Sequence, residues 1–162
     1  MNKESSMPFD LTGRMVTFGL DATATDLIRA HEARLLPHVG DVVDAYYAHL
    51  ARGEFAALMR PDALADLKAM RVVHWRLMLN ADFAAIRDHY LHRLGPRLVD
   101  GGFPRTIFVV AAEWFVLAFG ELVDADRTLD EAERRALRRV LTRIAFFDLA
   151  LSDGSRDLAW ID

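Results

Sequence analysis

The chain has 162 residues, which is enough for one domain with a sizeable buried core. A net charge of −4 leaves no cationic surface for nucleic acid, and the absence of cysteine excludes disulfides and thiolate metal sites. The N-terminus, MNKESSMPFD, lacks the apolar stretch of a secretory signal. The longest apolar run, residues 107–119, is too short to span a bilayer and contains Glu113. We therefore expect a cytoplasmic domain that binds neither membrane nor nucleic acid.

In the first half of the chain, apolar residues recur at helical spacing and strand patterns are nearly absent. The spacing predicts helices over residues 21–37, 39–50 and 61–80. The first of these helices has three candidate N-caps, which are Asp21, Thr23 and Thr25. Proline suits the first turn of a helix, so Pro37 and Pro61 fit the starts of the second and third helices.

Three more helices are predicted in the second half. Asp82 is the expected cap of a fourth helix, which Gly95-Pro96 should end or kink because the proline ring clashes with the preceding turn. A fifth helix is expected from Pro104 to about Leu122. Residues 128–131, Thr-Leu-Asp-Glu, resemble a capping box that opens a long last helix. The sequence therefore predicts an all-α domain of about six main helices.

The last two helices favour a dimer. The fifth is apolar on nearly every side, so it should be buried all round, either centrally in the fold or by a second subunit. Asp148, on the sixth, would be costly on an apolar face unless it were paired, and an arginine across a dimer interface is the simplest partner. The residues assigned to this interface are Trp114, Phe115, Leu141, Ile144 and Asp148.

Four segments resemble a known family in their order and separation. They are VDAYYAHL (43–50), LKAMRVVHW (67–75), LGPRLVDGGFPR (94–105) and FFDLALS (146–152). Together they are similar to globin-coupled sensors, the bacterial globin domains that precede chemoreceptor, kinase or diguanylate cyclase outputs. The resemblance covers roughly residues 15–152. It implies a globin-type helical fold, a homodimer through the last two helices and, in most members, a haem b that senses oxygen.

The resemblance also assigns roles to individual residues. Tyr47 matches the distal tyrosine that donates a hydrogen bond to bound oxygen, and Trp75 matches the second residue of a His-Trp pair. Leu94-Gly95 matches an Ile-Gly that lies three residues before the histidine that binds iron, and that position is Leu98 here. Leucine has no lone pair for iron, so no haem is expected. The predicted ligand pocket comprises Tyr47, Leu67, Arg71, Trp75 and Leu98.

Two histidines offer an alternative ligand for haem. If the fourth helix is regular up to Gly95, both His89 and His92 lie off its apolar stripe and face solvent. A shifted alignment would make His92 the iron ligand, but it places Gly101-Gly102 and Pro104 inside the fifth helix, at a cost in stability. Haem b bound through His92 or His89 therefore remains the less favoured interpretation.

Arg71 also has two interpretations. It lies near the apolar side of the third helix, four residues before Trp75. The simpler interpretation is that its aliphatic stem is buried and its guanidinium reaches water. In the other, it anchors a carboxylate or a propionate at the mouth of a pocket.

These observations lead to one functional hypothesis and two alternatives. The chain contains no glycine-rich phosphate loop, HExxH or Gly-x-Ser-x-Gly motif, so we do not expect an enzyme. We expect a sensory globin domain without haem, whose pocket binds another apolar molecule. The alternatives are a haem-b gas sensor and a helical dimerisation scaffold without ligand.

The predicted organisation has three parts. Residues 1–20 form an N-terminal extension, and residues 21–152 form the sensor domain. Residues 153–162 form a tail or the start of a linker to a signalling output domain, because the sequence SDGSRDLAWID follows soon after the last helix.

Overall fold

The computed structural model of the chain describes residues 10–158, with side chains up to Ser152, and all regular elements in this part are helical. The α-helices are α1 (Leu11–Thr17), α2 (Ala22–Leu35), α3 (Val39–Leu50), α4 (Pro61–Leu79), α5 (Phe83–His89), α6 (Gly95–Asp100), α7 (Thr106–Ala125) and α8 (Glu131–Leu158). Two 3-10 turns, η1 (Leu36–His38) and η2 (Ala56–Leu58), and a π-helical segment, η3 (Tyr90–Leu94), lie between them. The all-α prediction is confirmed.

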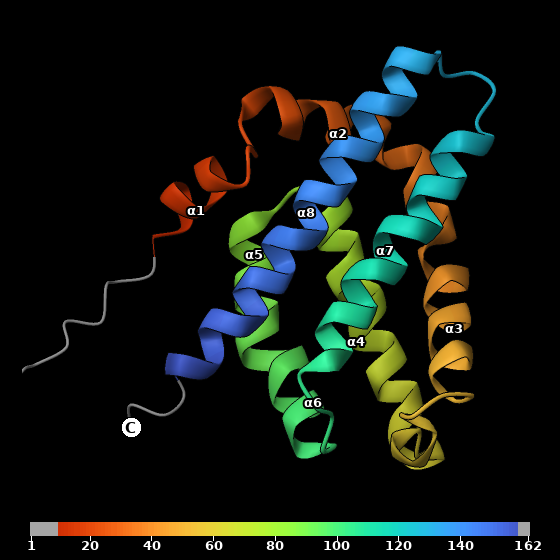
Figure 1. Cartoon of the computed structure of the whole chain (residues 1–162), viewed down its shortest axis with the longest axis vertical. Coiled ribbons are helices and arrows are strands. Elements are labelled where there is room, and N and C mark those ends of the chain that lie inside the picture. Colours follow the sequence, from red (N-terminus) through yellow and green to blue (C-terminus); the bar gives the residue numbers. More distant parts are fainter. Residues whose placement is uncertain (1–9, 159–162) are drawn as a thin grey trace, which may run out of the picture.

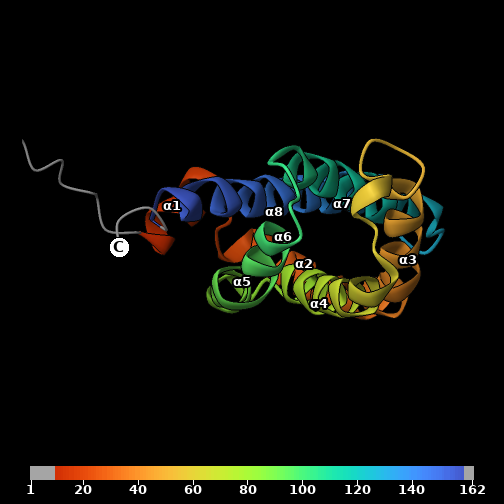
Figure 2. The ribbon, with the colours of Figure 1, turned by 90° about the horizontal axis from the view of Figure 1, so that it is seen from below.

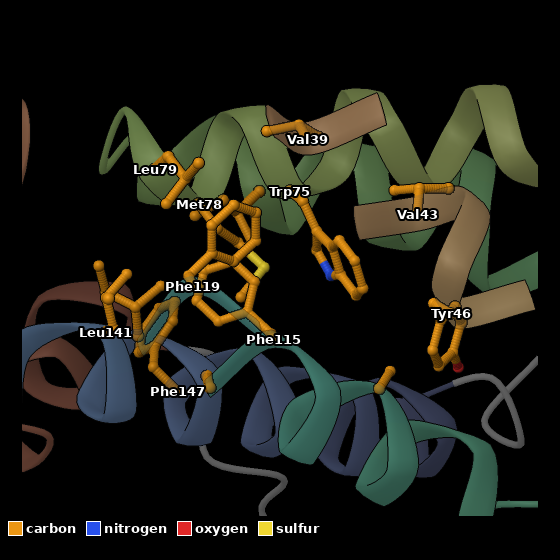
Figure 3. Packing of buried hydrophobic residues seen from close by; sticks show 14 of the residues in the cluster. Val39, Val43, Tyr46, Trp75, Met78, Leu79, Phe115, Phe119, Leu141 and Phe147 are labelled. Atoms are coloured by element: carbon orange, nitrogen blue, oxygen red, sulfur yellow. The ribbon is translucent and has the colours of Figure 1, made fainter. Parts of the chain in front are cut away.

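The helices form two layers with the core between them. Helices α7 and α8 pack side by side in one layer, and α2, α4 and α5 lie in the other (Figures 1 and 2). Helix α3 contacts both α4 and α7 and closes one end of the molecule. Large aromatic side chains meet in the middle, where Trp75 of α4 faces Phe115 and Phe119 of α7 (Figure 3). This aromatic contact joins the two layers.

Carboxylates cap the starts of α2 and α8. Of the three candidate caps for α2, Asp21 accepts a hydrogen bond from the Ala24 amide at 2.9 Å. The capping box of α8 consists of Asp130 and Glu133, whose side chains each bond the other's amide at 2.8 Å. The predicted box two residues earlier is wrong, because the Thr128 hydroxyl is hydrogen-bonded within the preceding turn.

Of the two outcomes expected at Gly95-Pro96, an end or a kink of the fourth predicted helix, the structure excludes the end. Helix α5 continues through the π-helical segment η3 directly into α6. The Gly95 amide donates to the carbonyl of Tyr90, five residues earlier, so the turn is wider than an α-helical turn. Pro96 then occupies the first turn of α6, where its missing N–H is not needed.

Helix α7 is not buried centrally in the fold, which was one of the two ways in which the sequence predicted its burial; the other was a second subunit. Val109 and Leu117 are 56% and 52% exposed on its outer side, whereas Phe115 and Phe119 lie in the core. Among the described helices, α7 is the one that is long and apolar enough to cross a membrane by composition. A core helix also meets that test, and α7 packs against α8 and α3.

Both ends of the domain differ from the predicted boundaries. The described part of the predicted N-terminal extension contains α1. Phe18, which follows α1, packs edge-on against Phe147 of α8, with 6.0 Å between the ring centres. The Arg14 guanidinium donates to the Ala150 carbonyl at 3.1 Å. At the other end, α8 continues to Leu158, through most of the predicted tail. Residues 1–9 and 159–162 lie outside the described part.

Candidate functional site

The five predicted pocket residues lie in the interior, on α3, α4 and α6. Tyr47, Leu67, Arg71, Trp75 and Leu98 are each no more than 5% exposed. Helix α3 presents Tyr47 on its buried stripe, and α4 presents Leu67, Arg71 and Trp75 at four-residue intervals along one side. The structure therefore buries all five predicted pocket residues.

Tyr47 makes two contacts inside this region. Its hydroxyl donates to the Leu67 carbonyl at 3.3 Å, which ties α3 to α4. Its ring meets that of Tyr46 edge-on at 5.1 Å. Tyr46 is also buried, its hydroxyl donates to the Ile107 carbonyl at 3.5 Å, and burial raises the pKa of its phenol. The phenol of Tyr46 is therefore a neutral hydrogen-bond donor.

Arg71 does not reach water, so the solvent-facing interpretation of this residue is wrong. The side chain is 1% exposed, and its guanidinium carbon lies 5.6 Å from the Tyr46 ring centre and 5.8 Å from the Trp75 ring centre. No described residue accepts a hydrogen bond from Nε or Nη2. Burial on its own would lower the pKa of Arg71, but Tyr47, Tyr46 and Asp148 together raise it, so the group stays charged.

Trp75 and Leu98 fill space in the core. The ring centre of the Trp75 indole lies 5.5 Å from that of Tyr46 and 5.8 Å from that of Phe115 (Figure 3). Leu98, which α6 supplies, is 1% exposed and belongs to the same hydrophobic cluster. The position that the resemblance assigns to an iron-binding histidine is therefore an apolar part of the core.

His89 is not on the solvent face that the sequence predicted. Its Nδ1 lies 3.2 Å from Nδ1 of His74, a fully buried residue of α4. Burial, together with the neighbouring charges of His74, Arg71 and Arg93, lowers the pKa of His89 to about 4. The sequence pattern placed His89 off the apolar stripe, but α5 packs against α4 on that side as well.

Asp148 is paired within its own chain, which corrects the predicted pairing across a dimer. The Nε2–H of His74 donates to Asp148 Oδ1 at 2.7 Å. His74, His89 and Asp148 thus form a hydrogen-bonded chain that joins α4, α5 and α8. Among the described residues, no group of three or more His, Asp and Glu side chains is placed to hold a metal ion.

His92 faces solvent, as predicted. Its side chain is 69% exposed, and its Nε2 lies 3.6 Å from Asp88 one turn earlier. An imidazole in this position points away from the core and from Leu98.

Four of the residues assigned to the dimer interface face inward. Phe115, Leu141 and Ile144 have no exposed surface, so they cannot contact a second subunit. Trp114 is half-buried and donates its indole N–H to the Val42 carbonyl of α3 at 3.2 Å. For Trp114 and Phe115, helix α7 is apolar at nearly every position, so periodicity could not indicate which side faces out.

The described residues line two grooves near this region. One, of about 310 Å3, lies between the start of α4 and the end of α6, at the lower end of the molecule in Figure 1, and reaches inward to Leu67. The other, of about 460 Å3, lies on the outer face of α7 and α8 and is lined by Val109 and Phe146. Leu67 is the predicted pocket residue that the first groove reaches.

A comparison with protein families identifies this arrangement. The model of the Protoglobin family matches residues 8–153. The chain belongs to the protoglobin family. The predicted resemblance and the globin-like helical fold are thus confirmed. No curated protein matches the chain.

Protoglobins are ligand-binding and sensory globins and are not typically enzymes. They usually bind haem. In this protoglobin, the tyrosine, tryptophan and leucine that the sequence assigned to a pocket are all buried. Sequence reasoning missed Tyr46, although this residue lies on the same stripe as Tyr47, and it missed the contact between His74 and Asp148. The latter two are 74 residues apart, and nothing local in the sequence indicates their pairing.

Proposed function

We propose that this protoglobin is a haem-independent sensory or regulatory domain. The observation that carries the proposal is Leu98, an apolar and fully buried residue at the position where the resemblance expects the iron ligand. Haem iron requires an axial donor from the protein for a defined coordination state. Leucine supplies none.

The other side chains of the region do not fit a haem group either. His89 uses its Nδ1 on His74, and His92 points to solvent. The guanidinium of Arg71 and the indole of Trp75 occupy the interior between α3, α4 and α7, where they contact each other and Tyr46. A porphyrin would have to displace these aromatic and cationic contacts without gaining a bond to iron.

The outer face of α7 and α8 supports a homodimer as part of this proposal. Val109, Leu117 and Phe146 are each more than half exposed there, and a groove runs between Val109 and Phe146. Large apolar side chains gathered on one face favour burial against a partner. A second copy of the chain would cover this face, and the two layers of each subunit would stay intact.

The proposed role in the cell is regulation of a signalling output. We infer a cytoplasmic domain whose dimer passes a change in its core to an attached or separate output domain. A dimerisation scaffold without ligand is the second candidate, and the dense aromatic packing around Trp75 favours it.

Titration of the purified chain with haemin tests the proposal. We expect no Soret band with resolved axial-ligand features in the ferric or ferrous state, because the core lacks a donor for iron. The variants His89→Ala and His92→Ala should give the same spectra as the wild type. His38→Ala, at an exposed site on η1, reports any haemin that adsorbs to surface imidazoles.

A saturable Soret band of ligated haem that persists in His38→Ala would overturn the proposal. Its loss in His92→Ala or His89→Ala would identify the ligand and establish a haem sensor. Loss of the Soret band in the His38 variant alone would instead reveal surface adsorption, which leaves the core free of haem.

A further inference from the structure

Arg71 carries a charge inside the core with two hydrogen-bond donors that no described residue satisfies. Buried polar groups in proteins are almost always hydrogen-bonded, and a buried charge without a counter-ion is among the most costly groups in a fold. The aromatic faces of Tyr46 and Trp75 offset part of this cost, but they accept no N–H hydrogen bond in the guanidinium plane. The two free donors therefore mark a site for an acceptor.

The identity of the donors indicates the shape of the acceptor. Nε and Nη2 lie on the same edge of the guanidinium, and their N–H bonds run nearly parallel. Two parallel N–H donors match the two oxygens of a carboxylate in a bidentate pair. The free edge of Arg71 is thus complementary to one carboxylate group.

The chain itself does not supply that carboxylate from its described part. Asp148 is the nearby acid that raises the pKa of Arg71, but its Oδ1 is hydrogen-bonded to His74. Arg71 forms no ion pair with any described acid, whereas Arg34, Arg60 and Arg97 each do. An anion for Arg71 has to come from outside the described chain.

The groove between α4 and α6 leads toward this site. It is lined by apolar residues on its inner side, Leu58, Leu67 and Phe103. Leu67 lines the groove and lies one helical turn before Arg71 on the same side of α4, so the groove reaches to within one turn of Arg71 along the helix.

The charges at the mouth of the groove select against polyanions. Arg60 pairs with Asp62 and Arg97 pairs with Asp66, each at 2.8 Å, and Asp100 adds a further negative charge. The mouth is therefore not cationic, and a phosphate or a nucleotide finds no excess positive charge there. The ligand class that fits is an organic monocarboxylate on an apolar body.

We propose that this protoglobin binds a monocarboxylate with an apolar chain, whose carboxylate is held by the free edge of Arg71 and whose chain extends toward the groove between α4 and α6. The proposal rests on the proposed haem-independent function, for which it names the ligand class. Binding would neutralise the charge in the core. This neutralisation is the means by which the ligand would alter the fold.

Thermal unfolding of the full chain with octanoate, below its micelle concentration, tests the proposal. We expect the melting temperature of the wild type to rise by about 5–10 °C at a hundredfold excess over Kd. Octanol, which has the same chain without the carboxylate, should cause no comparable rise. Sodium chloride at the same ionic strength is the control for an inorganic anion.

Two variants assign the effect to Arg71. Arg71→Met removes the charge and keeps an unbranched buried side chain, so the protein should fold and lose the response to octanoate. Arg76→Met removes the same charge from an exposed position of α4 and should respond like the wild type. Arg71→Lys keeps the charge but loses the paired donors, and we expect octanoate to bind at least tenfold more weakly. Calorimetric titration of each variant gives the Kd.

Three results would overturn the proposal. They are no shift with octanoate in the wild type, an equal shift with octanol or chloride, and an undiminished shift in Arg71→Met. If Arg71→Met does not fold, an unchanged Kd in Arg71→Lys decides the matter in the same way. The haemin titration is independent of all these outcomes, so a failure of carboxylate binding leaves the haem-independent function standing.

Discussion

His74 and His89 share one contact between their Nδ1 atoms, at 3.2 Å. One of the two nitrogens must carry the proton and the other must accept, because two N–H groups cannot face each other at this distance. His74 is also bound to Asp148 through its Nε2–H, which fixes its ring. Protonation of His89 is therefore disfavoured both by its burial and by its cationic neighbours Arg71 and Arg93. This contact makes the fold sensitive to acid.

We predict that the domain loses stability as the pH falls from about 6.5 to about 4 because of His89. The pKa of this imidazole is about 4 in the folded chain and 6.5 ordinarily. The unfolded chain thus binds the proton first, and the free energy of unfolding decreases over that window. After allowance for solvent screening, His89 should account for about 1–2 kcal/mol. Urea unfolding at pH 7 and pH 4 measures the loss.

The comparison that isolates His89 uses two variants. His89→Gln should lose less stability between the two pH values than the wild type. His92→Gln, at the exposed histidine one turn later, should keep the wild-type pH dependence. Identical pH dependence in the wild type and His89→Gln would contradict the prediction.

At the scale of residues, the sequence predicted which side chains are buried better than it predicted their hydrogen-bond and ion-pair partners. The resemblance assigned Tyr47 and Leu98 to a pocket, and the structure buries both. Arg71 was given two interpretations, one in solvent and one at the mouth of a pocket, and Asp148 was assigned to a second subunit. A charged residue near an apolar stripe has several physically sensible partners, and the contact that decides among them comes from a distant helix.

At the scale of elements, the π-helical segment η3 places Leu98 in the core. Ile86, Tyr90, Leu94 and Leu98 are all buried, at strict four-residue spacing. On a regular α-helix with 3.6 residues per turn, that spacing would drift around the surface by about 40° at each step. The wider turn at η3 compensates for part of the drift. The sequence predicted that Gly95-Pro96 would end or kink the helix, because the rule for proline does not anticipate a wider turn.

We predict that Gly95→Ala destabilises the fold by about 1–3 kcal/mol. A Cβ at this position would lie 2.8 Å from the Tyr90 carbonyl oxygen, which is the acceptor of the wide turn. Gly40→Ala is the matched control, since a Cβ there meets nothing within 4 Å, and it should stabilise α3 by about 0.5–1 kcal/mol. Urea unfolding of both variants measures the changes, and a neutral Gly95→Ala would show that the wide turn is dispensable.

At the scale of the whole molecule, the two layers expose different surfaces. The layer of α7 and α8 (Figure 2) carries three large apolar residues that are each more than half exposed, Val109, Leu117 and Phe146. The sequence indicated that these helices form an interface but selected residues that turned out to be the inner ones. When almost every position of a helix is apolar, periodicity cannot tell the two sides apart.

We predict that Phe146→Glu shifts the chain from dimer to monomer, with at least a tenfold rise in the dimer Kd. Phe146 is 53% exposed, so the substitution should leave the free energy of unfolding of the monomer nearly unchanged. Val73→Glu, at a comparably exposed position of α4, should remain dimeric. Sedimentation velocity over a concentration series measures the distribution. A wild type that is monomeric throughout would remove the dimer from the proposed function.

Helix α8 is uninterrupted, so a change at its interior contacts affects the position of its distant end. Twenty-eight residues rising 1.5 Å each make a rod of about 42 Å, and a tilt of roughly five degrees displaces one tip by about 4 Å relative to the other. A hydrogen bond between Asp148 and the buried His74 joins α8 to α4, and a hydrogen bond from Arg14 to the Ala150 carbonyl joins α8 to α1. A small shift at these interior contacts therefore becomes a displacement of ångström scale at the far end of α8.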